Sequence, residues 1–141
     1  KSPNGNSSRF ALPSTTAPAG SVLAILWDDL DQNLNIPGNN VFSRRIAAGV
    51  DPANPALHWI VQWHHWAHNA SQSDDYNFQI KIFDSGIIEY HYAAMVSVTS
   101  SQLGNGNGAT VWIESTDGGT ALVQSINQPL VRPNTAFRFT P

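Results

Sequence analysis

The sequence contains no cysteine, and this absence excludes several kinds of chemistry. A chain without thiols forms no disulfides, binds no metal through thiolates and has no cysteine nucleophile. It also lacks a run of about 18 apolar residues, the length that a membrane-spanning helix requires. We therefore predict a domain that is stabilised by its hydrophobic core alone and that does not insert into a membrane.

Charged side chains are also scarce. Only 12% of the 141 residues are Asp, Glu, Lys or Arg, and the formal net charge is −3. Such a chain offers no basic surface to attract phosphates, so nucleic acid is not an expected partner. Asn, Ser, Thr, Gly and Pro are abundant instead, a composition that favours a secreted or cell-surface location. The length fits one domain.

Short apolar and alternating segments dominate the chain after an Asn-, Ser-, Pro- and Thr-rich lead-in over 1–20, which is expected to be extended. The clearest signal is a hairpin, in which Phe78, Ile80 and Ile82 alternate with polar residues before a two-residue turn at Ser85-Gly86. About eight strands and little helix over 21–141 predict an all-β fold, an antiparallel, jelly-roll-like β-sandwich. The expected strands are 21–27, 41–47, 57–66, 75–83, 87–92, 109–114, 120–126 and 136–139, with 95–103 as a loop or one short helix.

Several blocks of sequence, taken in order, resemble a known family. Leu26-Trp27-Asp28-Asp29-Leu30 resembles the Phe-Trp-Asp-Asp-Leu signature of β-sandwich modules in secreted bacterial proteins, which are similar to nidogen-like domains. Ile60-Val61-Gln62-Trp63 resembles the Val-Gln-Trp strand of those modules, and Asn77-Phe78-Gln79-Ile80 resembles the start of their next hairpin. The resemblance implies a secreted accessory module, often joined to other domains of a longer parent chain. It implies no catalytic site.

Tryptophan is the most suggestive residue type. On a regular strand over 57–66, Trp59 and Trp63 share a face with Val61, whereas Trp66 lies on the other face. Only one face of a strand can be core in a two-layer sandwich, so the other face is covered by an insert or a partner, or it offers a stacking surface. Trp112 is expected to be exposed too. The residues predicted to bind a ligand are therefore Trp66, Trp112 and Tyr76, with His64 and His68 among the hydrogen-bonding partners.

Three aspartates, Asp28, Asp29 and Asp31, provide closely spaced oxygens of the kind that Ca²⁺ prefers. The run lacks the central glycine and the final glutamate of an EF-hand loop. The alternative is that these carboxylates accept backbone N–H groups at the end of a strand and keep a sheet edge soluble. The sequence therefore predicts no bound cofactor, with calcium at these aspartates as the alternative.

Histidine clusters raise a second metal hypothesis, zinc or copper, but no helix places two of them at i and i+4. Ordinary hydrogen-bonded or solvent-facing histidines fit the pattern better. The residues concerned are His58, His64, His65, His68 and His91.

Three functions follow from these patterns. The first is a non-catalytic extracellular module that binds carbohydrate or another polymer through exposed aromatic side chains, with Asn, Gln and His as hydrogen-bonding partners. The alternative is a structural or adhesive domain that docks against another domain or chain through strand edges. The third is a hydrolase that uses a metal or a pair of carboxylates, such as Asp28 or Asp29 with Glu89 or Glu114.

Overall fold

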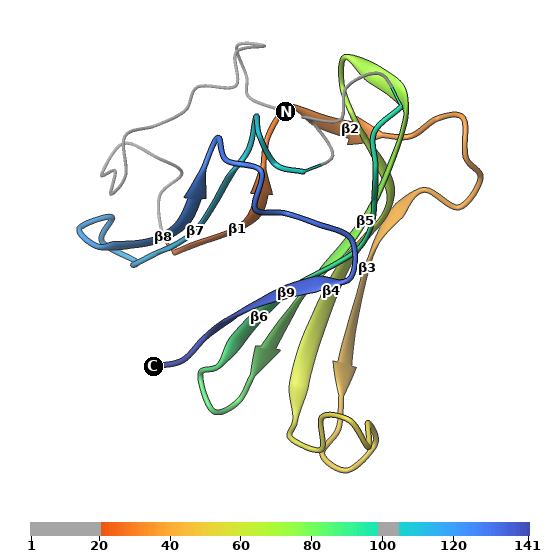
Figure 1. Ribbon diagram of the computed structural model, residues 1–141. Helices are drawn as coiled ribbons and strands as arrows, with labels where there is room; N and C mark the ends of the chain where they lie inside the picture. The colour runs from red at the N-terminus through yellow and green to blue at the C-terminus, as the bar shows by residue number, and fades with distance from the viewer. Residues whose placement is uncertain (1–20, 99–104) are drawn as a thin grey trace.

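The computed structural model describes residues 21–98 and 105–141, so the predicted lead-in over 1–20 lies outside the described residues. The described residues form nine strands in two antiparallel sheets, and none of them is helical (Figure 1). This confirms the predicted all-β, sandwich-like architecture. Within those same ranges, no helix is long and apolar enough to cross a membrane.

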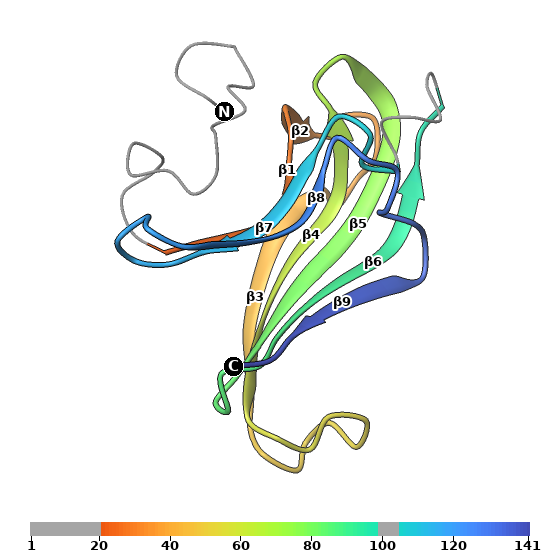
Figure 2. The ribbon, with the colours of Figure 1, turned by 60° about the vertical axis from the view of Figure 1, so that its left-hand side comes forward.

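The chain alternates between a small sheet and a large one. The small sheet has the order β1-β7-β8, with β1 at Val22–Trp27, β7 at Thr110–Glu114 and β8 at Ala121–Ile126. The large sheet has the order β2-β4-β5-β6-β9, and β3 pairs with β4 on the same side as β2. Figure 2 shows the small sheet lying against one face of the strongly twisted large sheet. The strands of the large sheet are β2 (Leu30–Gln32), β3 (Asn40–Ile46), β4 (His58–His68), β5 (Ser71–Phe83), β6 (Ile88–Val96) and β9 (Thr135–Phe139).

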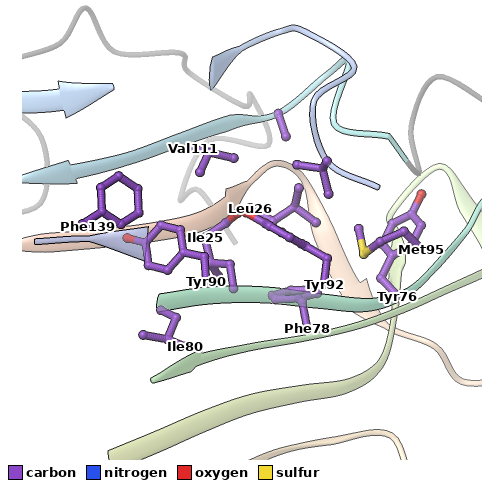
Figure 3. Close-up of a cluster of buried hydrophobic side chains, with 12 residues drawn as sticks. Ile25, Leu26, Tyr76, Phe78, Ile80, Tyr90, Tyr92, Met95, Val111 and Phe139 are labelled. Atoms are coloured by element: carbon purple, nitrogen blue, oxygen red, sulfur yellow. Dashed lines mark hydrogen bonds between the residues drawn. The ribbon is translucent and has the colours of Figure 1, made fainter. Parts of the chain in front are cut away.

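Between the sheets lies an aromatic core (Figure 3). We call the face of the large sheet that meets the small sheet the inner face. Trp63, Phe78 and Tyr92 are register partners across three strands of this face, and the Trp63 and Phe78 rings stack with centroids 5.2 Å apart. The buried cluster consists of Ile25, Leu26, Tyr76, Phe78, Ile80, Tyr90, Tyr92, Met95, Ala109, Val111, Val131 and Phe139.

Two tyrosines on β6 join the sheets. The Tyr92 hydroxyl donates to the Ile25 carbonyl oxygen of β1 at 2.6 Å, and the Tyr90 hydroxyl donates to the Trp112 carbonyl oxygen of β7 at 2.9 Å. Ile25 falls within the register irregularity of β1, so the hydroxyl satisfies a carbonyl group at a break in the ladder. Burial raises the pKa of both phenols, which keeps them protonated as donors.

At one end of the core, a buried carboxylate is the centre of a polar network. Asp74 has no exposed surface and accepts hydrogen bonds from the Tyr76, Ser71 and Ser97 hydroxyls and from the Val98 N–H group. Burial alone would raise the pKa of Asp74, but these hydrogen bonds outweigh it and hold the pKa below its usual value. The network fixes the start of β5.

The predicted hairpin is confirmed as β5 and β6, with the expected faces. Its turn is longer than the predicted two residues, because Phe83 N–H bonds to the Ile87 carbonyl and encloses three residues, with Gly86 in the left-handed region at φ +84°. The strand β6 also runs on to Val96, so Met95 is in a strand and not in a loop or helix; 99–104 lie outside the described residues. The sequence patterns did not predict β2.

Candidate functional site

The structure buries two of the three aromatic residues that were predicted to bind a ligand. Trp112 is only 2% exposed and Tyr76 only 1% exposed, so the expected exposure of Trp112 is wrong and neither ring offers a face to a ligand. The Trp112 ring lies edge-on against Trp27 with centroids 5.2 Å apart. Trp66 is half-buried and packs against the core. The exposed indole is Trp59, which is 49% accessible.

A bulge in β4 explains the position of Trp66. The register between β4 and β5 shifts between Trp63 and Trp66, and His65 lies in the left-handed region at φ +55°. An extra residue in a strand reverses the alternation of side chains beyond it. Trp66 therefore pairs with inward-facing Tyr76, on the same face as Trp63, and the predicted opposite faces are wrong.

The two histidines that were predicted to bind a ligand contact nearby backbone groups and a carboxylate instead. His64 Nδ1 lies 3.2 Å from the Gly38 carbonyl oxygen. His68 Nδ1 accepts the Ala70 N–H group at 3.1 Å, and its Nε2 lies 3.7 Å from Asp28 Oδ1. These residues lie on either side of Trp66 on β4, whereas Trp112 belongs to the small sheet, so the predicted set is not gathered into one site.

The three aspartates each use their carboxylate locally. Asp28 Oδ1 and Asp31 Oδ1 accept the N–H group of the following residue, both at 2.9 Å. Asp29 Oδ2 accepts from Asn69 Nδ2 at 3.2 Å. Over residues 21–98 and 105–141, no three His, Asp or Glu side chains are grouped in a way that could hold a metal ion. Asp28, just after β1, and Asp31, in β2, thus accept backbone N–H groups as the alternative expects, whereas Asp29 accepts from a side chain.

The outer face of the large sheet, opposite the core, carries a different feature. Gln62 of β4, Gln79 of β5, His91 of β6 and Ala136 of β9 are successive register partners, so their side chains form one row. Around this row lies a hollow of about 370 Å³, within the range of small-ligand sites. We call it the amide hollow. It is lined by Gln62, Asn77, Phe78, Gln79, His91, Tyr92, Ala93, Asn134, Thr135 and Ala136.

The β4 bulge organises one end of the amide hollow. Asn77 Oδ1 accepts the His65 N–H group at 3.1 Å, and Asn77 Nδ2 donates to Asp75 Oδ1 at 2.9 Å. The same Asp75 oxygen lies 2.9 Å from His65 Nδ1. These bonds hold the Asn77 amide in one orientation, so the hollow has a preformed wall on this side.

At the opposite end of the amide hollow, Glu89 contacts both a histidine and an arginine. His91 Nε2 lies 2.8 Å from Glu89 Oε2, and Glu89 Oε1 lies 3.4 Å from Arg138 Nη1. Glu89 is thereby engaged by both a histidine and an arginine. The lining of the hollow contains no Asp, Glu, Lys or Arg, so no charged side chain lies on its surface, which combines amide and imidazole groups with apolar carbon.

The glutamines differ from their surroundings because no described residue binds their amides. Neither Gln62 nor Gln79 makes a side-chain hydrogen bond to another residue of the described chain, although both are half-buried. Each amide offers a carbonyl acceptor and two N–H donors. Two such groups side by side can bind a neutral ligand rich in hydroxyl groups.

Sequence reasoning did not single out Gln62 and Gln79. A signal was present, because alternation places Gln79 on the polar side of its strand and His91 on the polar side of the next. Aligning these two sides across the hairpin turn brings the residues opposite each other. Gln62 could not be added without the register of β4, which the sequence does not reveal.

Comparison with known proteins identifies a family for this chain. A family model described as NIDO related matches residues 2–140 of the chain, which is nearly its whole length. No curated protein matches the sequence, and no solved structure does either.

Proposed function

Since this chain belongs to the NIDO-related family, whose model spans almost all of it, we propose that it is a non-catalytic recognition module acting outside the cell. Its ligand is a neutral carbohydrate or a similar hydroxyl-rich polymer, bound in the amide hollow of the large sheet. The observation that carries the proposal is the pair of half-buried amides of Gln62 and Gln79, which make no side-chain hydrogen bond to any described residue.

Sugar hydroxyls are both donors and acceptors, and glutamine amides have the same two capacities. In the free protein these amides bond to water, so a ligand that replaces the water keeps their hydrogen bonds while burying its own surface. The Asn77 amide and the His91 imidazole are already oriented by protein contacts, which lowers the entropy lost on binding.

An aromatic side chain extends the row of the hollow. Phe42 of β3 is the register partner of Gln62 and is 49% exposed, with its ring edge-on to His64 at a centroid distance of 6.1 Å. Side chains of paired residues lie on the same face. The exposed Phe42 ring can therefore stack on a sugar ring whose hydroxyls reach Gln62.

The test is binding of a panel of neutral and acidic polysaccharides, measured by calorimetry and by NMR of the glutamine side-chain amides. We expect a neutral polysaccharide to bind and to shift the Gln62 and Gln79 amide signals. Each of Gln62→Ala and Gln79→Ala should weaken binding roughly tenfold, the equivalent of about one good hydrogen bond. Gln124→Ala, an exposed glutamine on β8, is the matched control and should bind normally.

The outcomes separate the possibilities. If no polysaccharide in the panel binds, the proposal is wrong. If one binds and the Gln62→Ala/Gln79→Ala double variant binds it equally well, the site is elsewhere on the molecule.

A further inference from the structure

The strand β3 forms an open edge of the large sheet. Among residues 21–98 and 105–141 it pairs only with β4, and Asn40 to Arg45 are all exposed. Figures 1 and 2 both show β3 at the margin of the sheet with no strand beyond it. An edge strand of this kind presents a row of unpaired backbone donors and acceptors on its open side.

This edge is long and regular. All seven residues of β3 pair consecutively with β4 without a register shift, and the strand contains no proline. Natural edge strands are commonly shortened, bulged or interrupted by proline to prevent pairing with other chains. By contrast, β1 is interrupted by a register shift, and β9 has only five residues. The structure therefore leaves β3 able to accept another strand along its length.

The backbone groups that point outward can be identified. Val41 N–H donates to the Asn40 side chain at 2.8 Å, so it is not used in the ladder with β4. Alternate residues of an antiparallel strand point their N–H and C=O groups the same way. Ser43 and Arg45 thus also point away from β4, and neither forms a hydrogen bond to a described residue beyond the β3–β4 pairing.

The side chains of the edge are basic and partly apolar. Arg44 and Arg45 are adjacent, so one lies on each face of the sheet, and neither has an ion-pair partner within the described ranges. Val41 is 41% exposed on the inner face, and Trp59, the register partner of Arg45, is 49% exposed. This free positive charge lies on a chain whose net charge is −3.

From these features we infer that β3 is a docking edge for an extended, acidic segment of another polypeptide, which adds to the large sheet as a further strand. Main-chain hydrogen bonds to Ser43 and Arg45 provide the pairing, and adjacent acidic residues reach Arg44 and Arg45 on the two faces. A second copy of the chain is a poorer occupant, because two β3 edges would bring four arginines into one short ladder. The pairing uses backbone groups of Ser43 and Arg45, none of which lines the amide hollow, although Phe42 on the same strand belongs to the proposed sugar site.

Fluorescence anisotropy with a short labelled peptide tests the inference. The peptide contains the sequence Glu-Glu-Thr-Val-Val. When its two glutamates lie opposite the two arginines, its last valine lies opposite Val41. We expect the wild-type domain to bind it and to protect the Ser43 and Arg45 amides from hydrogen exchange. Affinity should fall at high salt because the charges are exposed.

Variants of β3 separate pairing from charge. Ser43→Pro removes an outward N–H group without touching the ladder and should weaken binding at least tenfold, whereas Ser43→Ala should leave it unchanged. The Arg44→Glu/Arg45→Glu variant should lose the glutamate peptide and instead bind a peptide with lysines in place of the glutamates. Thermal unfolding checks that each variant is folded. If Ser43→Pro does not fold, the Arg44→Glu/Arg45→Glu variant still tests the inference.

Two results would overturn the inference. If folded Ser43→Pro binds the peptide as well as wild type and no amide is protected, the contact is one of charge alone. If the wild-type domain self-associates in size-exclusion chromatography and Ser43→Pro abolishes this, the edge pairs with a second copy. The Arg44→Glu/Arg45→Glu variant should bind polysaccharide normally, because Gln62, Gln79 and Phe42 are intact, so that variant distinguishes this inference from the proposed function.

Discussion

The inner and outer faces of the large sheet are made of alternate residues of the same strands. Trp63, Phe78 and Tyr92 form a row on the inner face, and their sequence neighbours Gln62, Gln79 and His91 form a row on the outer face. The inner row is fixed by packing, since each ring fills space that no other side chain occupies. The amides of the outer row are under no such constraint. Residues one position apart therefore divide into those that fold the domain and those available to a ligand.

Replacing neighbouring residues on β5 gives the largest expected contrast. Phe78→Ala leaves a cavity in the aromatic core and should lower the free energy of unfolding by about 3–5 kcal/mol. Gln79→Ala should change it by less than about 0.5 kcal/mol, because that side chain lies outside the core cluster and makes no side-chain hydrogen bond to a described residue. Chemical denaturation of both variants measures the difference. Equal losses would mean that the outer face also carries the fold.

Asp74 is the polar exception on the core side of the sheet. Asp74→Asn keeps the size of the side chain but turns an acceptor into a donor toward groups that themselves donate. We expect a loss of about 2 kcal/mol in the free energy of unfolding, since a buried donor is left without a partner. Asp75→Asn, on the other face, is the comparison and should cost less. A loss as large for Asp75→Asn would contradict this account.

The tyrosine contacts between the sheets test whether hydroxyl groups or rings hold the inner face together. Tyr92→Phe keeps the ring but removes the bond to the Ile25 carbonyl, and should lower stability by about 1 kcal/mol. Tyr90→Phe should behave similarly through Trp112. Thermal unfolding of the single and double variants measures the two effects. No change in either variant would show that water replaces the hydroxyls.

Acid provides the smallest and most selective test. The pKa of Asp74 is held below its usual value in the folded state, so folding favours the ionised carboxylate. Its contribution to stability is present above the unfolded pKa of about 4 and is lost as the pH falls through the folded value. The stability difference between wild type and Asp74→Asn should therefore shrink as the pH is lowered from 6 toward 3. A difference that grows in acid would reverse the sign that we assign.

Local patterns predicted the parts of the fold that depend on alternation. Phe78 and Ile80 on β5 and Tyr90 and Tyr92 on β6 face the core as their spacing requires. The strand β2 was missed because its three residues are too few to show a period. The family resemblance, based on ordered motifs such as Trp27-Asp28-Asp29, is confirmed by the match over residues 2–140.

The site was harder to predict because it depends on register and layering. The bulge at His65 has no glycine to mark its left-handed conformation, so the reversal that turns Trp66 inward was invisible. Trp112 and Val111 lie on opposite faces of β7, as alternation predicts, yet both are buried. The reason is that β7 is the central strand of its sheet, and four of its five residues are buried. The amide hollow joins residues from four strands, and sequence alone places only two of those strands side by side.

The order in which the chain visits its two sheets constrains how it can be assembled during synthesis. Val22 of β1 has no partner until Glu114 of β7 has been made, and β6 has no neighbour on its far side until β9 follows. Neither sheet is complete within one uninterrupted stretch of chain. Folds dominated by such distant pairings form in milliseconds to seconds. A ribosome adding about 5–20 residues per second therefore exposes unpaired strands for several seconds before the sandwich can close.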